Sequence, residues 1–168
     1  MPIRQVRIVR ADAHRPPFSD AIFDTVIIES VLVFCDAATV ITEIRRVLKP
    51  DSVLGVNEFT FLKSPPARLV SLLTVTLGIH TFQQGEWETI LRKAGFADVT
   101  SSVHKINLWE QLASHLKADG VKNYLTAILT GVKDTSIRGT FFNKEMLAAA
   151  RDFLPYVGYG IYTGKKLQ

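Results

Sequence analysis

One short stretch, DTVIIESVLVF at residues 24–34, constrains the fold more than any other part of this sequence. It is rich in β-branched residues and apolar on both faces, except for Glu29 and Ser30. A strand that is apolar on both faces is typical of the middle of a parallel sheet, where helices cover each side. The stretch therefore predicts a buried strand in an α/β fold.

The segments around it predict the other elements of such a sheet. QVRIVRAD, residues 5–12, alternates apolar and charged side chains and predicts a strand with one exposed face. A helix capped by Asp36 is predicted over residues 37–50, followed by a strand over residues 52–59 that ends at Glu58. The order strand, loop, strand, helix, strand indicates an α/β sheet.

The rest of the chain continues the alternation of helices and strands. Helices are predicted from Ala67, over residues 85–96 with Gly95 as a left-handed cap, and in three segments between residues 108 and 155. Strands are predicted over residues 98–106 and 158–166. There is no internal repeat and no linker, so we expect a single domain over residues 1–168.

Composition and charge exclude several classes of function. The formal net charge is +4, but the basic residues are scattered and do not alternate with aromatic residues, so we expect no nucleic-acid partner. The longest apolar run, residues 69–79, is too short for a membrane span. A single cysteine, Cys35, and four scattered histidines give no disulfide and no metal site. These features predict a cytoplasmic protein without a resident metal.

Several short motifs, taken in order and at their spacing, resemble a known family. They are an acid and a small residue at Asp12-Ala13, the Pro17-Phe18 turn, F-D-x-V at residues 23–26, E-x-x-R-V-L-K-P at residues 43–50, and L-R-K-A-G-F at residues 91–96. Together they resemble the class I S-adenosylmethionine (SAM)-dependent methyltransferases of type 11. The resemblance implies a Rossmann-like methyltransferase sheet with helices on both faces, truncated so that it starts at the family's third strand. It also implies SAM as the cofactor.

The resemblance assigns cofactor-binding roles to six residues. The pair Asp12 and Ala13 would hold the adenine, and the backbone at Glu29 and Ser30 would face the methionine end of SAM. The other two residues expected at the cofactor are His14 and Phe18. A purely structural role is the alternative for three of these residues: Asp12 could cap a turn, Glu29 could be a buried acid with satisfied hydrogen bonds, and Phe18 could pack in the core. The catalytic base, if one is needed, is left open among His14, Glu29, Glu58, His80 and His104.

The sequence departs from the family at its start. Only eleven residues precede Asp12, and no glycine-rich strand–loop–helix lies among them. The family's first two strands lie between the third and the fourth, so the strand at residues 24–34 would present an unpaired apolar edge. We expect a homodimer or a partner chain that supplies the glycine-rich loop. The remaining option is that the strand at residues 5–12 slides over to pair with this edge.

The predicted function is SAM-dependent methyl transfer to a small, apolar molecule. The apolar segment Pro65–Ile79 and the aromatic residues Phe59, Phe61, Phe82 and Trp87 fall where the family covers its acceptor. The alternative is a non-catalytic, methyltransferase-like subunit or binding module.

Overall fold

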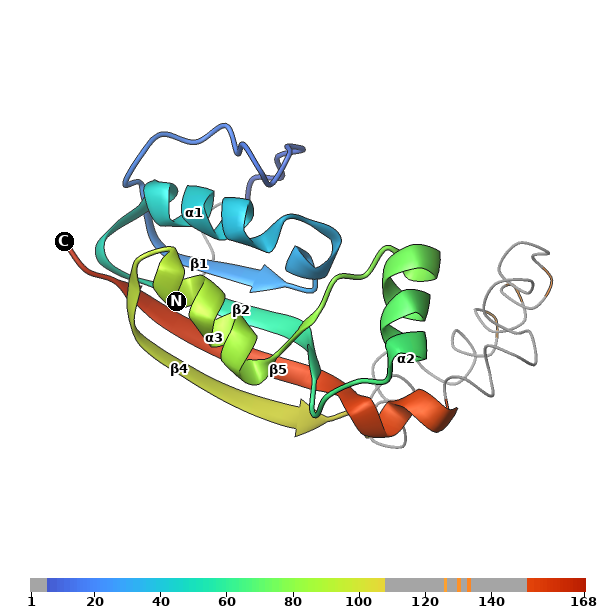
Figure 1. Ribbon diagram of the computed structural model, residues 1–168. Helices are drawn as coiled ribbons and strands as arrows, with labels where there is room; N and C mark the ends of the chain where they lie inside the picture. Colours follow the sequence, from blue (N-terminus) through green and yellow to red (C-terminus); the bar gives the residue numbers. More distant parts are fainter. Residues whose placement is uncertain (1–5, 108–125, 127–129, 131–132, 134–150) are drawn as a thin grey trace.

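The computed structural model describes residues 6–107, 126, 130, 133 and 151–168. A single sheet carries helices packed along it (Figure 1). In chain order the elements are β1 (Phe23–Glu29), the 3-10 turn η1 (Leu32–Phe34), α1 (Ala37–Val47), β2 (Leu48–Phe61), α2 (Ala67–Ser71), the π-helical turn η2 (Leu72–Thr76), β3 (Phe82–Gln83), α3 (Gln84–Lys93), β4 (Phe96–Lys105), the 3-10 turn η3 (Leu154–Tyr156) and β5 (Val157–Lys166).

The sheet is mixed, with the strand order β1-β2-β5-β4. Strands β1 and β2 are parallel and are joined by α1, as expected for a βαβ unit. Strand β5 lies between β2 and β4 and is antiparallel to both. The short β3 extends the sheet beside the end of β2. The carboxyl ends of β1 and β2 therefore lie together at one end of the sheet.

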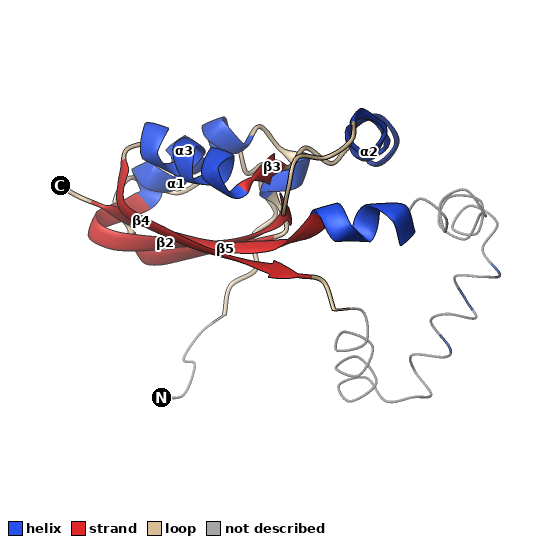
Figure 2. Ribbon diagram, turned by 60° about the horizontal axis from the view of Figure 1, so that its bottom comes forward, coloured by secondary structure: helices blue, strands red, loops and turns tan. Residues whose placement is uncertain are grey.

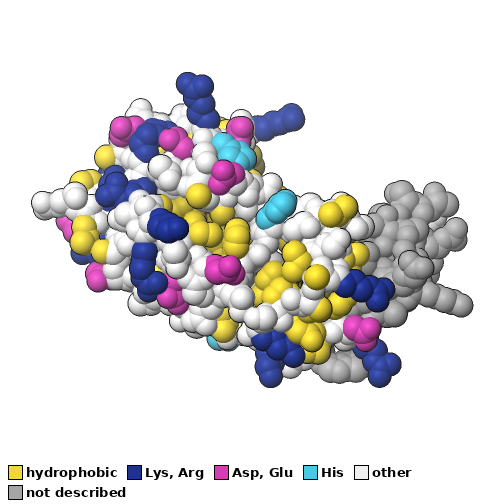
Figure 3. All heavy atoms as spheres, in the orientation of Figure 1, with side chains coloured by type: hydrophobic (Ala, Val, Ile, Leu, Met, Phe, Trp, Pro, Cys, Tyr) yellow, Lys and Arg dark blue, Asp and Glu magenta, His cyan; other side chains and the backbone are white. Residues whose placement is uncertain are grey.

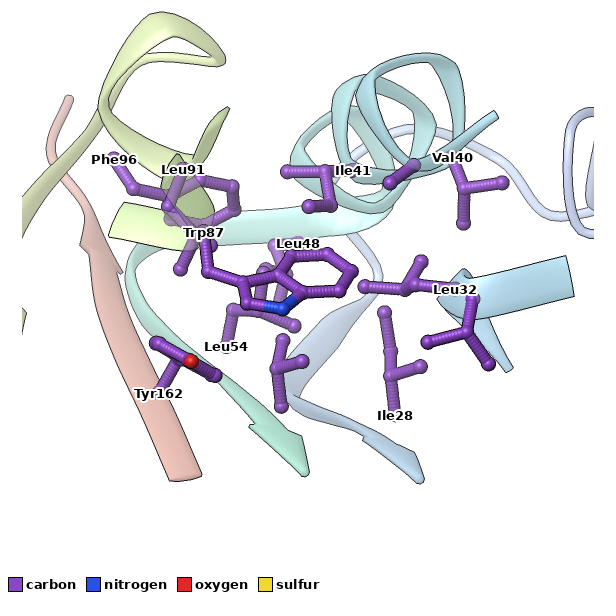
Figure 4. Close-up of a cluster of buried hydrophobic side chains, with 13 residues drawn as sticks. Ile28, Leu32, Val40, Ile41, Leu48, Leu54, Trp87, Leu91, Phe96 and Tyr162 are labelled. Carbon is purple, nitrogen blue, oxygen red and sulfur yellow. The ribbon is translucent and has the colours of Figure 1, made fainter. Parts of the chain in front are cut away.

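One face of the sheet carries the main core. Helices α1 and α3 pack on this face (Figure 2), and residues Leu54, Val56 and Glu58 of β2 point into it and are buried. Trp87 of α3 is fully buried against Tyr162 of β5, at the centre of the cluster in Figure 4. The core therefore forms where the apolar sides of two helices meet one side of the sheet.

The opposite face is open in the described part of the chain. Val53 of β2 and Ile161 of β5 point to this side and are 41% and 44% exposed. No described helix covers them (Figure 2). The expectation of helices on both faces is therefore met on one face. Most of the residues predicted to form three helices between 108 and 155 lie outside the described residues, and the described residues 126, 130, 133 and 151–153 are helical.

Local sequence signals place the two covering helices as predicted. The side chain of Asp36 accepts from the backbone N–H groups of Ala38 and Thr39, which confirms the cap of α1. Gly95 follows α3 with φ +88°, a conformation that favours glycine. Helix α1 ends at Val47, before Pro50, because the chain already enters β2 at Leu48.

Two predictions about strands are wrong. Residues 6–12 form no strand, and Ile8 is 96% exposed. Residues 23–29 do form β1, parallel to β2, but β1 is the edge of the described sheet rather than its middle, and Ile27 is 76% exposed. A strand needs a partner for its backbone groups, and no strand of the described part of the chain pairs with residues 6–12. The option that this segment slides over to pair with β1 is therefore contradicted, whereas the unpaired apolar edge is confirmed.

Neighbouring residues of β2 differ in burial, and this difference gives a direct test of which face of the sheet carries the core. Leu54→Ala removes a fully buried side chain, so we expect the free energy of unfolding to fall by about 2–5 kcal/mol. The neighbouring control Val53→Ala, on the open face, should cost less than about 1 kcal/mol. Urea denaturation of the isolated chain measures both changes. Equal losses for the two variants would contradict the assignment of the core to one face.

Candidate functional site

The site begins where β1 ends. Ser30 follows β1 with φ +53°, which is uncommon for a residue with a side chain, and turns the chain toward η1. Its backbone N–H donates to the carbonyl oxygen of Asn57 in β2, at 2.9 Å. The loop after β1 is thus attached to β2 at the carboxyl ends of two parallel strands, where ligands bind in open α/β sheets.

A buried carboxylate fixes the same loop. One oxygen of Glu58, Oε1, accepts from the backbone N–H groups of Val31 (2.8 Å) and Leu32 (2.6 Å). Glu58 is only 1% exposed, and its second oxygen, Oε2, has no hydrogen-bond donor among the described residues. Burial raises the pKa of the Glu58 carboxyl, and the N–H donors at Leu32 and Val31 oppose that change. Glu58 therefore acts on the loop as a positioning residue.

Asp12 and His14 form a compact turn beside α1. The Oδ1 atom of Asp12 accepts from the backbone N–H of His14 at 2.9 Å and lies 2.8 Å from Nδ1 of its ring. The other ring nitrogen, Nε2, accepts from the backbone N–H of Asp36 at 3.2 Å, which assigns the proton of the neutral ring to Nδ1. These bonds to His14 lower the pKa of the Asp12 carboxyl, so it stays ionised. The turn-cap role of Asp12 is thus real, and its Oδ2 atom is left for another partner.

Cys35 shows that the two acidic groups converge. The thiol is half-buried, and burial raises its pKa first, followed by the negative charges of Asp12 and Glu58. Both carboxylates therefore lie within electrostatic range of the start of α1. A thiol with a raised pKa is a poor nucleophile, which agrees with an unreactive Cys35.

The six residues expected at the cofactor fall in three places. Glu29 ends β1 and Ser30 follows it, whereas the turn at Asp12–His14 meets the start of α1, with Ala13 packed against the core. Phe18 lies elsewhere. It contacts Phe23 edge-to-face, with ring centroids 5.0 Å apart, and lines an apolar pocket of about 290 Å³ beside the open edge of β1. Their role in cofactor binding stays a prediction.

A second pocket, of about 400 Å³, opens at the carboxyl ends of the strands, and we call it the sheet-end pocket. It takes residues from β2, β4 and β5 and from Ser30, which directly follows β1, so it extends across the end of the sheet. Its lining consists of Ser30, Asn57, Glu58, Phe59, Lys105, Ile106, Asn107, Gly158 and Tyr159.

Sequence reasoning missed Asn57 and Tyr159 of this pocket. The available signal is the polar pair Asn57-Glu58 inside the otherwise apolar strand VLGVNEFTF. Tyr159 joins the pocket through the pairing of β5 with β2. The sequence gives no local signal of this pairing, because more than ninety residues separate the two strands.

Most of the aromatic residues predicted to cover the acceptor belong to the core instead. Trp87 is fully buried, and Phe82 packs on it edge-to-face at 5.0 Å. Phe61 belongs to a second cluster with Leu69 and Leu73 of the Pro65–Ile79 segment. Figure 3 shows hydrophobic side chains gathered near α2, where this cluster meets the surface.

Only Phe59 of those four aromatic residues lines the sheet-end pocket. Among the described residues there is no group of three or more side chains that could hold a metal ion, and no helix long and apolar enough to cross a membrane.

Comparison with known proteins finds similarity to methyltransferases. A family model described as a methyltransferase domain matches residues 2–56. An uncharacterised methyltransferase of Bacillus subtilis, YodH, is 33% identical over 88 residues, which are 52% of this chain and 38% of that protein. These two matches show that the chain is similar to methyltransferases over part of its length. The matched region includes β1, α1 and the loop that Glu58 holds.

Several solved structures share the fold over nearly all of the chain. Phosphoethanolamine N-methyltransferase 2 of Haemonchus contortus, in complex with phosphomonomethylethanolamine and S-adenosylhomocysteine, has a TM-score of 0.70 at 15% identity, covering 94% of this chain and 36% of that chain. A Galdieria sulphuraria protein described as a sarcosine dimethylglycine methyltransferase has a TM-score of 0.67 at 15% identity, covering 94% and 58%. The cyclase SpnF has a TM-score of 0.66 at 23% identity, covering 94% and 54%. The chain thus spans about a third to three-fifths of these relatives.

The buried Glu58 gives the stability of the candidate site a pH dependence. Because burial raises the pKa of this carboxyl, the folded protein binds its proton more tightly than the unfolded chain does. This contribution to the free energy of unfolding is fully present below the ordinary pKa of 4.5 and is lost as pH rises through the folded-state value. In urea denaturation from about pH 4 to about pH 8, wild type should therefore lose stability relative to Glu58→Gln as pH rises. Parallel curves for the two proteins would contradict this account.

Proposed function

We propose that this chain takes part in SAM-dependent methyl transfer to a small, largely apolar acceptor. One observation carries the proposal: the loop at Ser30 and the sheet-end pocket meet at the carboxyl ends of β1 and β2, and the turn at Asp12–His14 is bonded to the start of α1, which follows that loop. A cofactor side and an acceptor side at one sheet end are what a transfer between two small molecules requires. The similarity to methyltransferases supports the same proposal.

The residues of this chain fit the cofactor's adenine and methionine ends. Oδ1 of the ionised Asp12 is engaged with His14, so Oδ2 is left to accept from an exocyclic amine. The side chain of Asp12 is 70% exposed, so a nucleotide can approach it. Ser30 and Glu29 offer backbone and side-chain oxygens at the end of β1, where an ammonium group would be stabilised.

The chemistry requires little beyond positioning. When bound, SAM supplies a sulfonium methyl group, whose carbon–sulfur bond breaks as the acceptor bonds to the carbon, with the electron pair left on sulfur. The chain itself would hold the acceptor in line with the sulfur–methyl bond, in a pocket from which acceptor binding displaces water. The loop fixed by Glu58 and the turn fixed by His14 provide such a preorganised frame. We assign no general base.

The open edge of β1 supports the proposal that the working form contains more polypeptide than the described residues. Ile27 and the apolar pocket beside Phe18 are exposed along this edge, and an uncovered apolar edge favours strand addition. A second copy of the chain or a partner that brings a glycine-rich loop would cover it. Calorimetric titration of the chain with SAM, alone and with the product of the neighbouring gene, separates these cases.

A second candidate is a non-catalytic, methyltransferase-like subunit. The open face and the open edge of β1 favour it, because both surfaces are suited to a partner. SpnF, described as a cyclase, shows that this fold is not limited to one reaction. Absence of SAM binding, both by the isolated chain and with its partner, would favour the subunit over the enzyme.

The adenine role of Asp12 can be tested with two variants and a control. In the assembly that binds SAM, Asp12→Ala should weaken SAM affinity about tenfold, because a charge-assisted hydrogen bond to the exocyclic amine is lost. Asp12→Asn keeps an acceptor for the backbone N–H of His14, so it retains the turn while removing the charge, and should weaken affinity less. Isothermal titration calorimetry measures both.

The matched control is Asp24→Ala, at the opposite end of β1, where an exposed carboxylate pairs with Lys49 at 2.7 Å. Its SAM affinity should equal that of wild type. Unchanged affinity in Asp12→Ala would remove Asp12 from the cofactor site.

A further inference from the structure

The open face of the sheet presents aromatic rings at the sheet-end pocket. Phe59 of β2 lies opposite Tyr159 of β5, and Tyr159 lies opposite His104 of β4, with no register shift at these residues. Side chains of directly opposite residues point to the same face, so the three rings share the open face. The rings of His104 and Tyr159 are stacked, with centroids 5.1 Å apart and planes 22° apart. The faces of phenyl and phenol rings contact flat apolar groups and attract cations.

A carboxylate and an amide lie beside these rings on the same face. Glu29 of β1 lies opposite Asn57 of β2, and Asn57 is two residues before Phe59 on the same strand. Glu29 is exposed and forms no ion pair within the described part of the chain. A carboxylate accepts hydrogen bonds and attracts positive charge, so this corner of the open face favours a cation that carries N–H groups.

The amide of Asn57 is an acceptor in need of a donor. Its Oδ1 atom is buried and receives no hydrogen bond from the described residues, although Asn57 borders the sheet-end pocket. A buried acceptor without a donor is costly, so a ligand that brings an N–H group gains a bond there. The terminal torsion of an asparagine side chain is soft, so a rotation of the amide turns the oxygen toward the pocket. Asn57 and Glu29 together give one ammonium group two acceptors.

Two lysines close to this region leave the negative charge in place. Lys105 borders the pocket, but it follows His104 in β4, so its side chain points to the opposite face of the sheet. Lys165 shares the open face but lies at the other end of the sheet, where it pairs with Asp51 at 3.2 Å. At the pocket end of the open face, the described strands thus carry the negative charge of Glu29.

We propose that the sheet-end pocket binds an arylalkyl ammonium ion, in which a short linker joins a primary ammonium group to a flat apolar ring. The nitrogen lies at Glu29 and Asn57, and the ring lies on Phe59 and Tyr159. Two residues along a strand span about 7 Å, which suits a linker of two carbon atoms. The nitrogen is the end of the ligand nearest to the Ser30 loop, because the backbone carbonyl of Asn57 accepts from Ser30. This rests on the proposed function only for the role of the ligand as methyl acceptor.

Four small probes test this class of ligand on the full chain, with binding followed by titration of amide NMR shifts. The reference probe is phenethylamine. Phenethyl alcohol lacks the charge, phenethyltrimethylammonium keeps the charge without an N–H group, and 3-phenylpropionate reverses the charge. We expect phenethylamine to bind about threefold to tenfold more tightly than each of the others, with shifts at Asn57, Tyr159 and Ile161.

Two variants locate the interactions of the ammonium group. Glu29→Gln should reduce phenethylamine binding to the level of phenethyl alcohol and leave binding of the alcohol unchanged. Asn57→Leu should reduce phenethylamine binding to the level of phenethyltrimethylammonium and leave binding of that probe unchanged. The unchanged probe in each variant separates loss of one interaction from misfolding. The matched control Asp98→Asn, which removes an exposed carboxylate at the opposite end of the sheet, should bind all probes as wild type does.

The outcomes keep this inference distinct from the proposed function. Equal or tighter binding of 3-phenylpropionate, or shifts confined to other surfaces, would overturn the ligand class even if S-adenosylhomocysteine binds. Displacement of phenethylamine by S-adenosylhomocysteine would assign Glu29 and Asn57 to the cofactor's own ammonium group and would also overturn it. Binding of phenethylamine in the sheet-end pocket without any binding of S-adenosylhomocysteine would support the pocket and overturn methyl transfer.

Discussion

The candidate site depends on two hydrogen bonds, in which two backbone N–H groups donate to one buried oxygen of the Glu58 carboxylate. Glu58 comes from β2 and its partners, Val31 and Leu32, come from the loop after β1, so one side chain fixes the loop against the neighbouring strand. The positive φ of Ser30 is sustained by this contact and by the bond to Asn57. The sheet-end pocket borders this loop, and the proposed cofactor side includes it, so both depend on where Glu58 holds it.

Much of the fold could be predicted from sequence because its signals are local. Asp36 caps α1, Gly95 ends α3, and the apolar alternation of β2 marks its buried side, and each acts within a few residues. Residues 6–12 show the limit of such signals. Their alternation is that of a strand, but a strand exists only beside a partner, and pairing is a property of the whole sheet.

The candidate site was predictable where short motifs carry it and not where strands far apart in sequence build it. Asp12 and Ser30 were predicted as site residues from their motifs. Asp12 also caps its own turn, which was the structural alternative considered for it. Trp87 and Phe82 were expected to cover the methyl acceptor, but both pack in the core. The pairing of Tyr159 with Phe59 and His104 depends on register, which the sequence alone does not determine.

The central claim is that the cofactor side lies at the carboxyl ends of β1 and β2, on the loop that Glu58 holds. Mapping of amide NMR shifts upon addition of S-adenosylhomocysteine, with this chain labelled in the assembly that binds the cofactor, tests it most directly. The account predicts shifts at residues 12–14 and 29–32. Shifts confined to the outer surfaces of α1 and α3, or binding with no change at those residues, would contradict it.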